Sequence, residues 1–244
     1  MNNILIAIPS KSRPVYSKSK ELLKSAILFI PEYEEKYYSK IYDKNEFILV
    51  PSDIKGITKT RNWILKNVNF KYVVFVDDDL KQTGYWMDKE NGKRKFIKIQ
   101  NENIIINEFK KLFQLCDDMN YKLFSVKSEN SKISQHDEKP ILFQSYLTAS
   151  CMGIVNDGEY YFDENFELKE DYEIGLRHIK NKGGIIAARY FSWENHHWGR
   201  EGGCGDYRND ELEKKCINQL IKLYPEYVRK VEKKNSQYCI KLQF

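Results

Sequence analysis

The stretch that decides the fold is Tyr72-Val73-Val74-Phe75-Val76-Asp77-Asp78-Asp79-Leu80, an apolar run that ends on three consecutive carboxylates. A short run of β-branched and aromatic residues is typical of a strand buried on both faces. In open α/β sheets ligands bind at the carboxyl ends of the strands, and carboxylate oxygens suit a hard divalent cation. The stretch therefore predicts a buried strand followed by a metal site that meets a substrate phosphate. A solvated turn is the simpler alternative.

The composition indicates one globular domain. The chain has 244 residues, of which 41% are hydrophobic, so it can bury a sizeable core. The mean hydropathy is −0.64 and no apolar stretch is long enough for a membrane span, so we expect no membrane partner. Five cysteines without a C-x-x-C pair favour reduced thiols and a cytoplasmic protein. A net charge of +5 does not by itself indicate nucleic-acid binding.

Strand-like runs alternate with helical patterns along the chain. This alternation predicts an α/β fold with a single mixed, mostly parallel sheet flanked by helices. We expect strands at 3–9, 46–50, 72–76, 121–126, 146–155 and 185–188, and helices at 17–30, 56–67, 102–119 and 169–182. The Asn91-Gly92 pair between two basic and aromatic runs predicts a β-hairpin insert over 84–99. Residues 127–140 are polar and without periodicity, which indicates a surface loop.

Four segments that contain charged or polar residues follow one another along the chain. They are Ile6–Pro14, the G-x-x-x-x-R-N segment Gly56–Asn62, the acids Asp77–Asp79, and the acidic pair Glu170–Asp171 at a predicted helix start. Together they resemble the motifs of the GT-A glycosyltransferases, and the resemblance spans roughly residues 3–205. It implies a Rossmann-like GT-A domain over 1–205 that includes the hairpin. Residues 206–244 are then expected to be a C-terminal helical extension packed on the same domain.

A fifth segment, Trp193–Cys204, narrows the resemblance. It is similar to the signature of the TET-associated glycosyltransferases, which are predicted to add sugars to hydroxymethylated pyrimidines in phage DNA. The resemblance implies transfer from a nucleoside diphosphate sugar, with UDP-glucose or UDP-N-acetylglucosamine as the expected donor. The acceptor would be a 5-hydroxymethylpyrimidine such as 5-hydroxymethylcytosine in double-stranded DNA, in a bacterial or phage-infected cell.

The acids and histidines are the expected metal ligands. A departing diphosphate gathers negative charge, which a divalent cation neutralises as a Lewis acid. The resemblance implies that Asp79 binds Mn²⁺ or Mg²⁺ directly and that Asp77 contacts the metal or the ribose. It also implies a histidine ligand from the C-terminal region, for which His196 and His197 are candidates. Adjacent residues of an extended chain point apart, so we expect at most one of the two to bind, and a packed or surface histidine pair beside Trp193 and Trp198 is the alternative.

The donor is expected to contact the loops that follow the first strands, because these loops line the nucleotide crevice of α/β proteins. An arginine among glycines also suits a diphosphate, since it pairs with phosphate bidentately. The expected donor contacts are Pro9, Ser10, Arg13, Asp53, Thr60, Arg61, Asp77, Asp78 and Arg200.

Asp171 is the candidate general base for the acceptor hydroxyl, by analogy with inverting GT-A enzymes. Glu170 or Glu173 could serve instead, and acids in the first turn of a helix also stabilise its dipole without any catalytic role. A retaining mechanism would need no such base, so both stereochemical outcomes stay open.

The predicted hairpin is the candidate acceptor-binding element. It follows the acids in sequence, so we expect it beside the active site, where aromatic and basic side chains would stack on bases and hold phosphates. The residues concerned are Trp86, Lys93, Arg94 and Lys95. A solubilising surface is the alternative for these charges.

Two other functions stay open alongside DNA modification. One is a cytoplasmic glycosyltransferase that acts on a polysaccharide, a lipid-linked sugar or a protein. The other is an inactive nucleotide- or DNA-binding module on the same fold. The sequence indicates no oligomeric state.

Overall fold

The computed structural model describes residues 4–15, 17–88, 94–127, 139–195, 208–232 and 238–244. Within these ranges the chain forms a ten-stranded mixed sheet in the order β3-β2-β1-β4-β9-β7-β10-β5-β6, with β8 paired to β10. Its strands are β1 Ile4–Pro9, β2 Ile27–Pro31, β3 Phe47–Val50, β4 Tyr72–Val76, β5 Leu80–Asp88, β6 Arg94–Lys98, β7 Leu123–Lys127, β8 Ile141–Leu142, β9 Cys151–Val155 and β10 Ile186–Asn195. The helices are α1 Lys18–Leu22, the 3-10 turn η1 Glu32–Glu34, α2 Glu35–Tyr38, α3 Ile57–Asn67, α4 Glu102–Asp118, α5 Glu170–Lys182 and α6 Asp210–Leu223.

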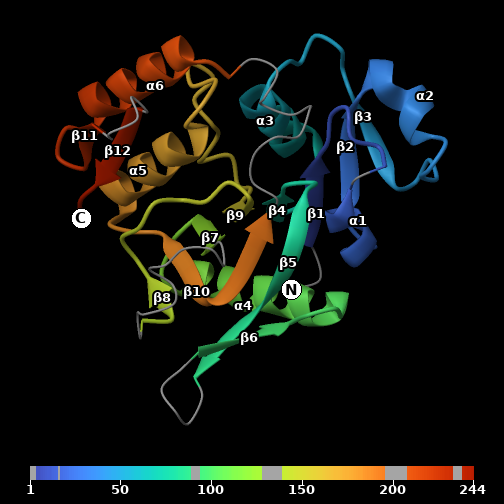
Figure 1. Cartoon of the computed structure of the whole chain (residues 1–244), viewed down its shortest axis with the longest axis horizontal. Coiled ribbons are helices and arrows are strands. Elements are labelled where there is room, and N and C mark those ends of the chain that lie inside the picture. The colour runs from blue at the N-terminus through green and yellow to red at the C-terminus, as the bar shows by residue number, and fades with distance from the viewer. Residues whose placement is uncertain (1–3, 16, 89–93, 128–138, 196–207, 233–237) are drawn as a thin grey trace.

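Most strands of the sheet point the same way, as expected for an α/β fold. The pairs β3–β2, β2–β1, β1–β4 and β7–β10 are parallel. Strands β9, β5 and β8 run against the strands beside them. The carboxyl ends of β1, β4 and β10 therefore lie at one edge of the sheet, which we call the rim (Figure 1).

The core lies on both faces of the sheet, and β4 contributes to both. Successive side chains of a strand point to opposite faces. Tyr72 and Val74 accordingly pack on one side, in a cluster that includes Phe109 of α4. Val73 and Phe75 pack on the other, in a cluster that includes residues of α3 and α5. Burial on both faces explains why β4 reads as a continuous apolar run.

The helices α3 and α5, which carry site residues, begin and end where the sequence predicts. Gly56 precedes α3 with φ 88°, a backbone conformation that favours glycine. Acidic side chains occupy the first turn of α5, where they stabilise the helix dipole, and Gly183 ends it in the left-handed conformation.

The expectation of a helix over 17–30 is wrong. Helix α1 ends at Leu22, and Ile27–Pro31 form strand β2 between β1 and β3. The apolar run that suggested a helix face is instead buried inside a parallel sheet, where hydrophobic periodicity cannot distinguish a short helix from a strand. The strand expected over 146–155 is likewise shorter, because only Cys151–Val155 pair with neighbouring strands.

The C-terminal segment is not purely helical. After α6, strands β11 Val228–Glu232 and β12 Tyr238–Leu242 form a two-stranded antiparallel sheet. Cys216, Leu220 and Tyr224 pack against Phe166 and Leu176 of the main domain. In the described part of the chain, no helix combines the length and apolar character that crossing a membrane requires.

Candidate active site

The acids that follow β4 lie at the rim and have different partners. Asp78 accepts hydrogen bonds from the Ser10 hydroxyl at 2.7 Å and from the Arg13 guanidinium at 2.9 Å. The Ser10 hydroxyl also lies 2.8 Å from the Tyr38 hydroxyl. Asp78 therefore ties the loop after β1 to the end of β4. Arg13 lies 3.8 Å from Asp79 Oδ2 as well, so this guanidinium faces two of the three acids.

Asp77 contacts residues of helices α1 and α3, of strand β10 and of the turn before β9. Its backbone N–H donates to Ser150 O at 3.0 Å, and its backbone oxygen accepts from the Ser19 hydroxyl. Its carboxylate accepts from Asn195 Nδ2 at 3.1 Å and lies 3.5 Å from Arg61. Burial, together with the neighbouring acids, raises the pKa of Asp77, and Arg61 opposes that shift. The burial is partial, because 40% of the side chain is exposed, and solvent or a bound cation would favour the ionised form.

Arg61 joins the two groups of acids. Its side chain is 2% exposed and lies near the rings of Phe75 and Phe162, at 5.8 and 5.6 Å from their centroids. Nη1 donates to Glu170 at 2.7 Å, and Nη2 donates to Ala149 O at 3.3 Å while lying close to Asp77. Because a guanidinium presents several donors in a fixed plane, it can hold both carboxylates in one geometry.

Glu170 and Asp171 begin α5. Burial raises the pKa of both carboxyl groups, and the Asp171 carboxylate raises the pKa of Glu170 further, while Arg61 opposes both shifts. Asp171 accepts the Tyr172 N–H at 2.9 Å. The Glu170 carboxylate forms an ion pair with Arg61. Asp171 forms no direct ion pair in the part of the chain that the structure describes.

The acids suit a hard divalent cation, since Mg²⁺ and Mn²⁺ prefer carboxylate oxygens. Asp78 accepts hydrogen bonds from both Ser10 and Arg13. Asp77 and Asp79 are the rim carboxylates that would meet such an ion, which would compete with Asn195 and Arg61 for Asp77 and with Arg13 for Asp79. Among the residues that the structure describes, no three His, Cys, Asp or Glu side chains gather closely enough to form a metal site. A cation here would therefore need ligands beyond these two carboxylates.

Some expected donor contacts reach the rim and others do not. Pro9 ends β1 next to Ser10, whereas Asp53 is exposed in the loop after β3. The Thr60 hydroxyl donates to Gly56 O at 2.9 Å, so it is used inside its own helix. His196, His197 and Arg200 lie outside the described residues. Asn195, which directly precedes them, contacts Asp77.

The hairpin leaves the rim, so the expectation that it lies beside the acids is wrong for its distal half. Strand β5 starts at the rim, where Leu80 pairs with Asn195, and runs antiparallel to β10. At about 3.3 Å per residue, Trp86 lies roughly 20 Å from the acids, and Figure 1 shows β5 and β6 extending away from the rim. The ring centroids of Trp86 and Phe96 lie 5.3 Å apart. Lys95 is exposed. Lys93 and the side chain of Arg94 are outside the described residues.

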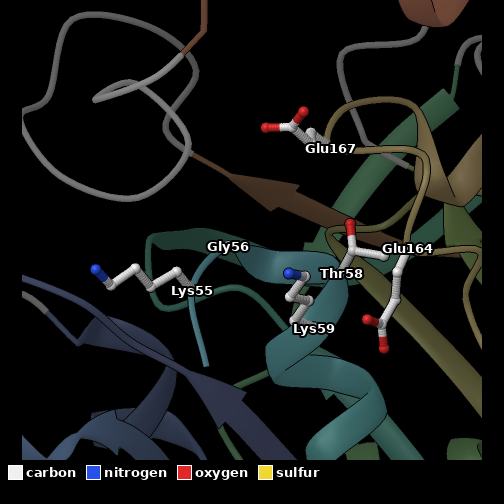
Figure 2. Close-up of a pocket in the computed structure, with 6 residues that line it drawn as sticks. All are labelled: Lys55, Gly56, Thr58, Lys59, Glu164 and Glu167. Atoms are coloured by element: carbon white, nitrogen blue, oxygen red, sulfur yellow. The ribbon is translucent and has the colours of Figure 1, made fainter. Parts of the chain in front are cut away.

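A hollow of about 490 Å³ lies beside the start of α3. Figure 2 shows Thr58 and Lys59 on the first turn of the helix, and Glu164 and Glu167 on the loop that faces it. The remaining lining residues are Lys55 and Gly56. The Thr58 hydroxyl donates to Phe166 O at 2.7 Å and so fixes that loop to α3. Arg61 lies one helical turn further along, on the side of the carboxylates.

Sequence reasoning missed three buried polar residues near the site. Asn195 lies within the segment Trp193–Cys204, whose pattern predicts no role for it. Lys127 and Arg189 are each 4% exposed, at the end of β7 and within β10. Burial, with Arg189 nearby, lowers the pKa of Lys127 to about 7, and Asp171 acts in the opposite direction. Only the extension of β10 past residue 188 could have indicated Asn195, and no local signal marks a buried lysine.

Comparisons with known proteins agree with this architecture. The model of the TET-associated glycosyltransferase family matches residues 6–203. No curated protein matches the chain. The structure of S. aureus TarS residues 1–349 in complex with UDP-GlcNAc is similar, with a TM-score of 0.53, 14% identity, and coverage of 90% of this chain and 66% of that one. This chain thus spans just under two thirds of that relative.

Glucosyl-3-phosphoglycerate synthase from Mycobacterium tuberculosis is also similar. Its complex with Mn²⁺, UDP and glucosyl-3-phosphoglycerate gives a TM-score of 0.55 at 8% identity, with coverage of 99% of this chain and 87% of that one. At such identities the likeness concerns the fold, which is of the GT-A type. Because the family model covers most of the chain, including the rim acids and α5, the protein belongs to the TET-associated glycosyltransferase family.

Proposed function

We propose that this protein transfers a sugar from a UDP-sugar to a 5-hydroxymethylpyrimidine base in DNA, with Mn²⁺ or Mg²⁺ at the rim acids. The observation that carries the proposal is the junction at Arg61, which brings the acids after β4 and the acids of α5 to one place. The family supports a DNA base as the acceptor. UDP, UDP-GlcNAc, Mn²⁺ and Mg²⁺ in the similar structures support the donor and the cation.

The donor would lie across the rim. Asp79 and Asp77 would hold the cation together with diphosphate oxygens, and the loop Ser10–Arg13 would line the nucleotide. When bound, the cation supplies positive charge that stabilises the leaving diphosphate. Asn195 donates to Asp77 and so fixes the end of β10 beside this proposed metal ligand.

The chemistry of transfer assigns distinct roles to the two acids of α5. The oxygen of the acceptor hydroxymethyl group attacks the anomeric carbon while the bond from that carbon to the diphosphate oxygen breaks, and the electron pair of that bond stays on UDP. Asp171 takes the hydroxyl proton, as a general base placed within hydrogen-bond reach does. Glu170 holds Arg61, which in turn orients Asp77. A base in this position implies inversion at the anomeric carbon.

The acceptor must bring its hydroxyl to within about 3–3.5 Å of the anomeric carbon, which favours a nucleotide turned out of the duplex. The hairpin would then contact flanking DNA rather than the reacting base. At about 3.4 Å per base pair, the roughly 20 Å between Trp86 and the acids corresponds to about six base pairs. Exposed Lys95 is placed for such a contact with phosphates.

The test is mass-spectrometric analysis of nucleosides after incubation of the protein with Mn²⁺, UDP-sugars and DNA that carries 5-hydroxymethylcytosine or 5-hydroxymethyluracil. We expect a gain of one sugar mass that is lost in Asp79→Ala and kept in Asp118→Ala, a matched change of an exposed acid on α4. Metal-dependent hydrolysis of a donor without a DNA product would instead favour a polysaccharide, lipid-linked or protein acceptor. Binding of UDP or DNA without donor hydrolysis or transfer would favour an inactive binding module.

A further inference from the structure

Four side chains form a continuous column beside the candidate base. The Lys127 ammonium lies 3.3 Å from the centroid of the Tyr146 ring and donates to the Tyr146 carbonyl oxygen at 2.7 Å. The Tyr146 ring stacks on Tyr172, with centroids 5.9 Å apart and planes inclined by 9°. The Lys169 ammonium lies 5.6 Å from the centroid of Tyr172. Along the column, the Lys127 ammonium is followed by the rings of Tyr146 and Tyr172 and then by the Lys169 ammonium, and each neighbouring pair attracts.

Both ends of the column are fixed to other elements. Lys127 ends β7, and its carbonyl oxygen accepts from the Ser192 hydroxyl of β10 at 3.2 Å. Lys169 lies 3.1 Å from Glu213 of α6. The column therefore runs from the sheet to the C-terminal helix and passes through Tyr172, the residue that follows Asp171.

The segment that carries Tyr146 also carries the backbone contacts of the candidate active site. Three positions later, the Ala149 carbonyl oxygen accepts a hydrogen bond from Arg61 at 3.3 Å, and the Ala149 N–H donates to Asp171. Ser150 accepts from the Asp77 N–H at 3.0 Å. A displacement of the Tyr146 ring would therefore move the backbone groups that hold Asp171.

Asp171 is surrounded mainly by positive charge. Among the described residues, the charged groups that act on it come from α3, the start of α5 and β7, and they are Arg61, Lys169 and Lys127, with Glu170 as the negative neighbour; Arg189 of β10 acts on Lys127 and Tyr146. Arg61 and Lys169 lower the pKa of Asp171, against the effect of burial. A buried ammonium costs free energy unless it is compensated, so packing alone gives no reason for a lysine at position 127.

We propose that Lys127 is a positioning residue for Asp171, which it holds in place through the Tyr146–Tyr172 stack so that this carboxylate faces the acceptor hydroxyl. The inference rests on the proposed function. It assigns Lys127 no contact with the sugar, the nucleotide or the DNA.

The test compares Lys127→Met with Lys127→Arg, which keeps the charge. We expect kcat for transfer to fall roughly 10- to 100-fold in Lys127→Met, because a small misplacement of a reacting group costs about that much. KM for DNA and the affinity for UDP should stay unchanged, and Lys127→Arg should recover most of the rate. Loss of a cation raises the pKa of Asp171, so the acid limb of the pH profile should move to higher pH.

Matched variants separate the column from general packing. Tyr146→Phe keeps the ring and should behave as wild type, whereas Tyr146→Leu should behave as Lys127→Met. Lys66→Met removes a different lysine, whose ammonium lies 5.4 Å from the centroid of the Tyr161 ring, and should change nothing. If Lys127→Met does not fold, Tyr146→Leu keeps both lysine charges and interrupts the stack, so the fall in kcat should be read from that variant.

A titration of the Asp171 carboxyl carbon by NMR, in wild type and Lys127→Met without substrate, tests the inference apart from any acceptor. An unchanged titration would overturn it even if the protein transferred no sugar to DNA. An unchanged kcat, or a rise in KM for DNA alone, would also overturn it, the latter because Lys127 would then contact the acceptor. If transfer to DNA fails but the titration also shifts in Tyr146→Leu, which keeps the Lys127 charge, the proposed acceptor is wrong and the positioning role stands.

Discussion

Replacement of Arg61 by methionine should destabilise the fold and abolish transfer. The guanidinium is 2% exposed and pairs with Glu170 at 2.7 Å, while the Glu170 side chain is 9% exposed. Removal of one partner of a buried ion pair leaves the other charge uncompensated, which costs about 3–5 kcal/mol. A domain of this kind is stable by about 5–15 kcal/mol, so Arg61→Met should still fold at low temperature.

The assay is urea unfolding followed by circular dichroism, with the double variant Arg61→Met/Glu170→Gln as the control. The neutral glutamine removes the stranded charge, so we expect the double variant to be more stable than Arg61→Met alone. The coupling free energy between the two positions should lie at about 1–3 kcal/mol. A destabilisation below about 1 kcal/mol, or additive effects of the two changes, would refute the buried ion pair as the element that joins the two groups of acids.

The pH dependence of Arg61→Met gives a second readout. Burial raises the pKa of Glu170 in the folded state, and Arg61 opposes that shift. Without Arg61 the pKa should rise further, so the folded protein binds a proton that the unfolded chain releases above its ordinary pKa of about 4.3. The free energy of unfolding should therefore fall as pH rises from the pKa of Glu170 in the unfolded chain to its raised pKa in the folded variant. The fall should be steeper than in wild type. A slope equal to that of wild type would contradict this account.

Four further outcomes follow from the structure. Asp79→Asn should weaken UDP binding at least about tenfold in Mn²⁺ but not in EDTA, as measured by calorimetry. Asp171→Asn should lower kcat by about 10²- to 10⁴-fold with UDP affinity unchanged, and a small effect would assign the base elsewhere. Lys95→Glu should weaken DNA binding and reduce its salt slope by about 1, without changing donor hydrolysis. His178 is fully buried, with Nε2 accepting from Lys122 N–H, and its pKa is lowered to about 4 by burial; acidification from pH 6.5 to 4 should therefore cost about 3 kcal/mol of stability, a slope absent from His178→Gln.

The hydrophobic runs and caps of this chain predicted much of the fold. The run Tyr72–Val76 gave β4 because a central strand is apolar on both faces. The acidic first turn and the glycine that follows the last turn gave α5. The prediction of a helix is wrong at Ile27–Pro31, because a short apolar segment without alternation fits a helix as well as a buried strand.

The sequence by itself placed acids after a buried strand and at the start of a helix, because both signals are local. Only the tertiary structure decided which of them share a site. The pairing of β10 with β5 set Asn195 against Asp77, and α3 delivered Arg61 between Asp77 and Glu170. The same antiparallel pairing carried the hairpin away from the rim, although it follows the acids directly in sequence. Strand direction and long-range ion pairs join residues about 100 positions apart, and no local pattern encodes them.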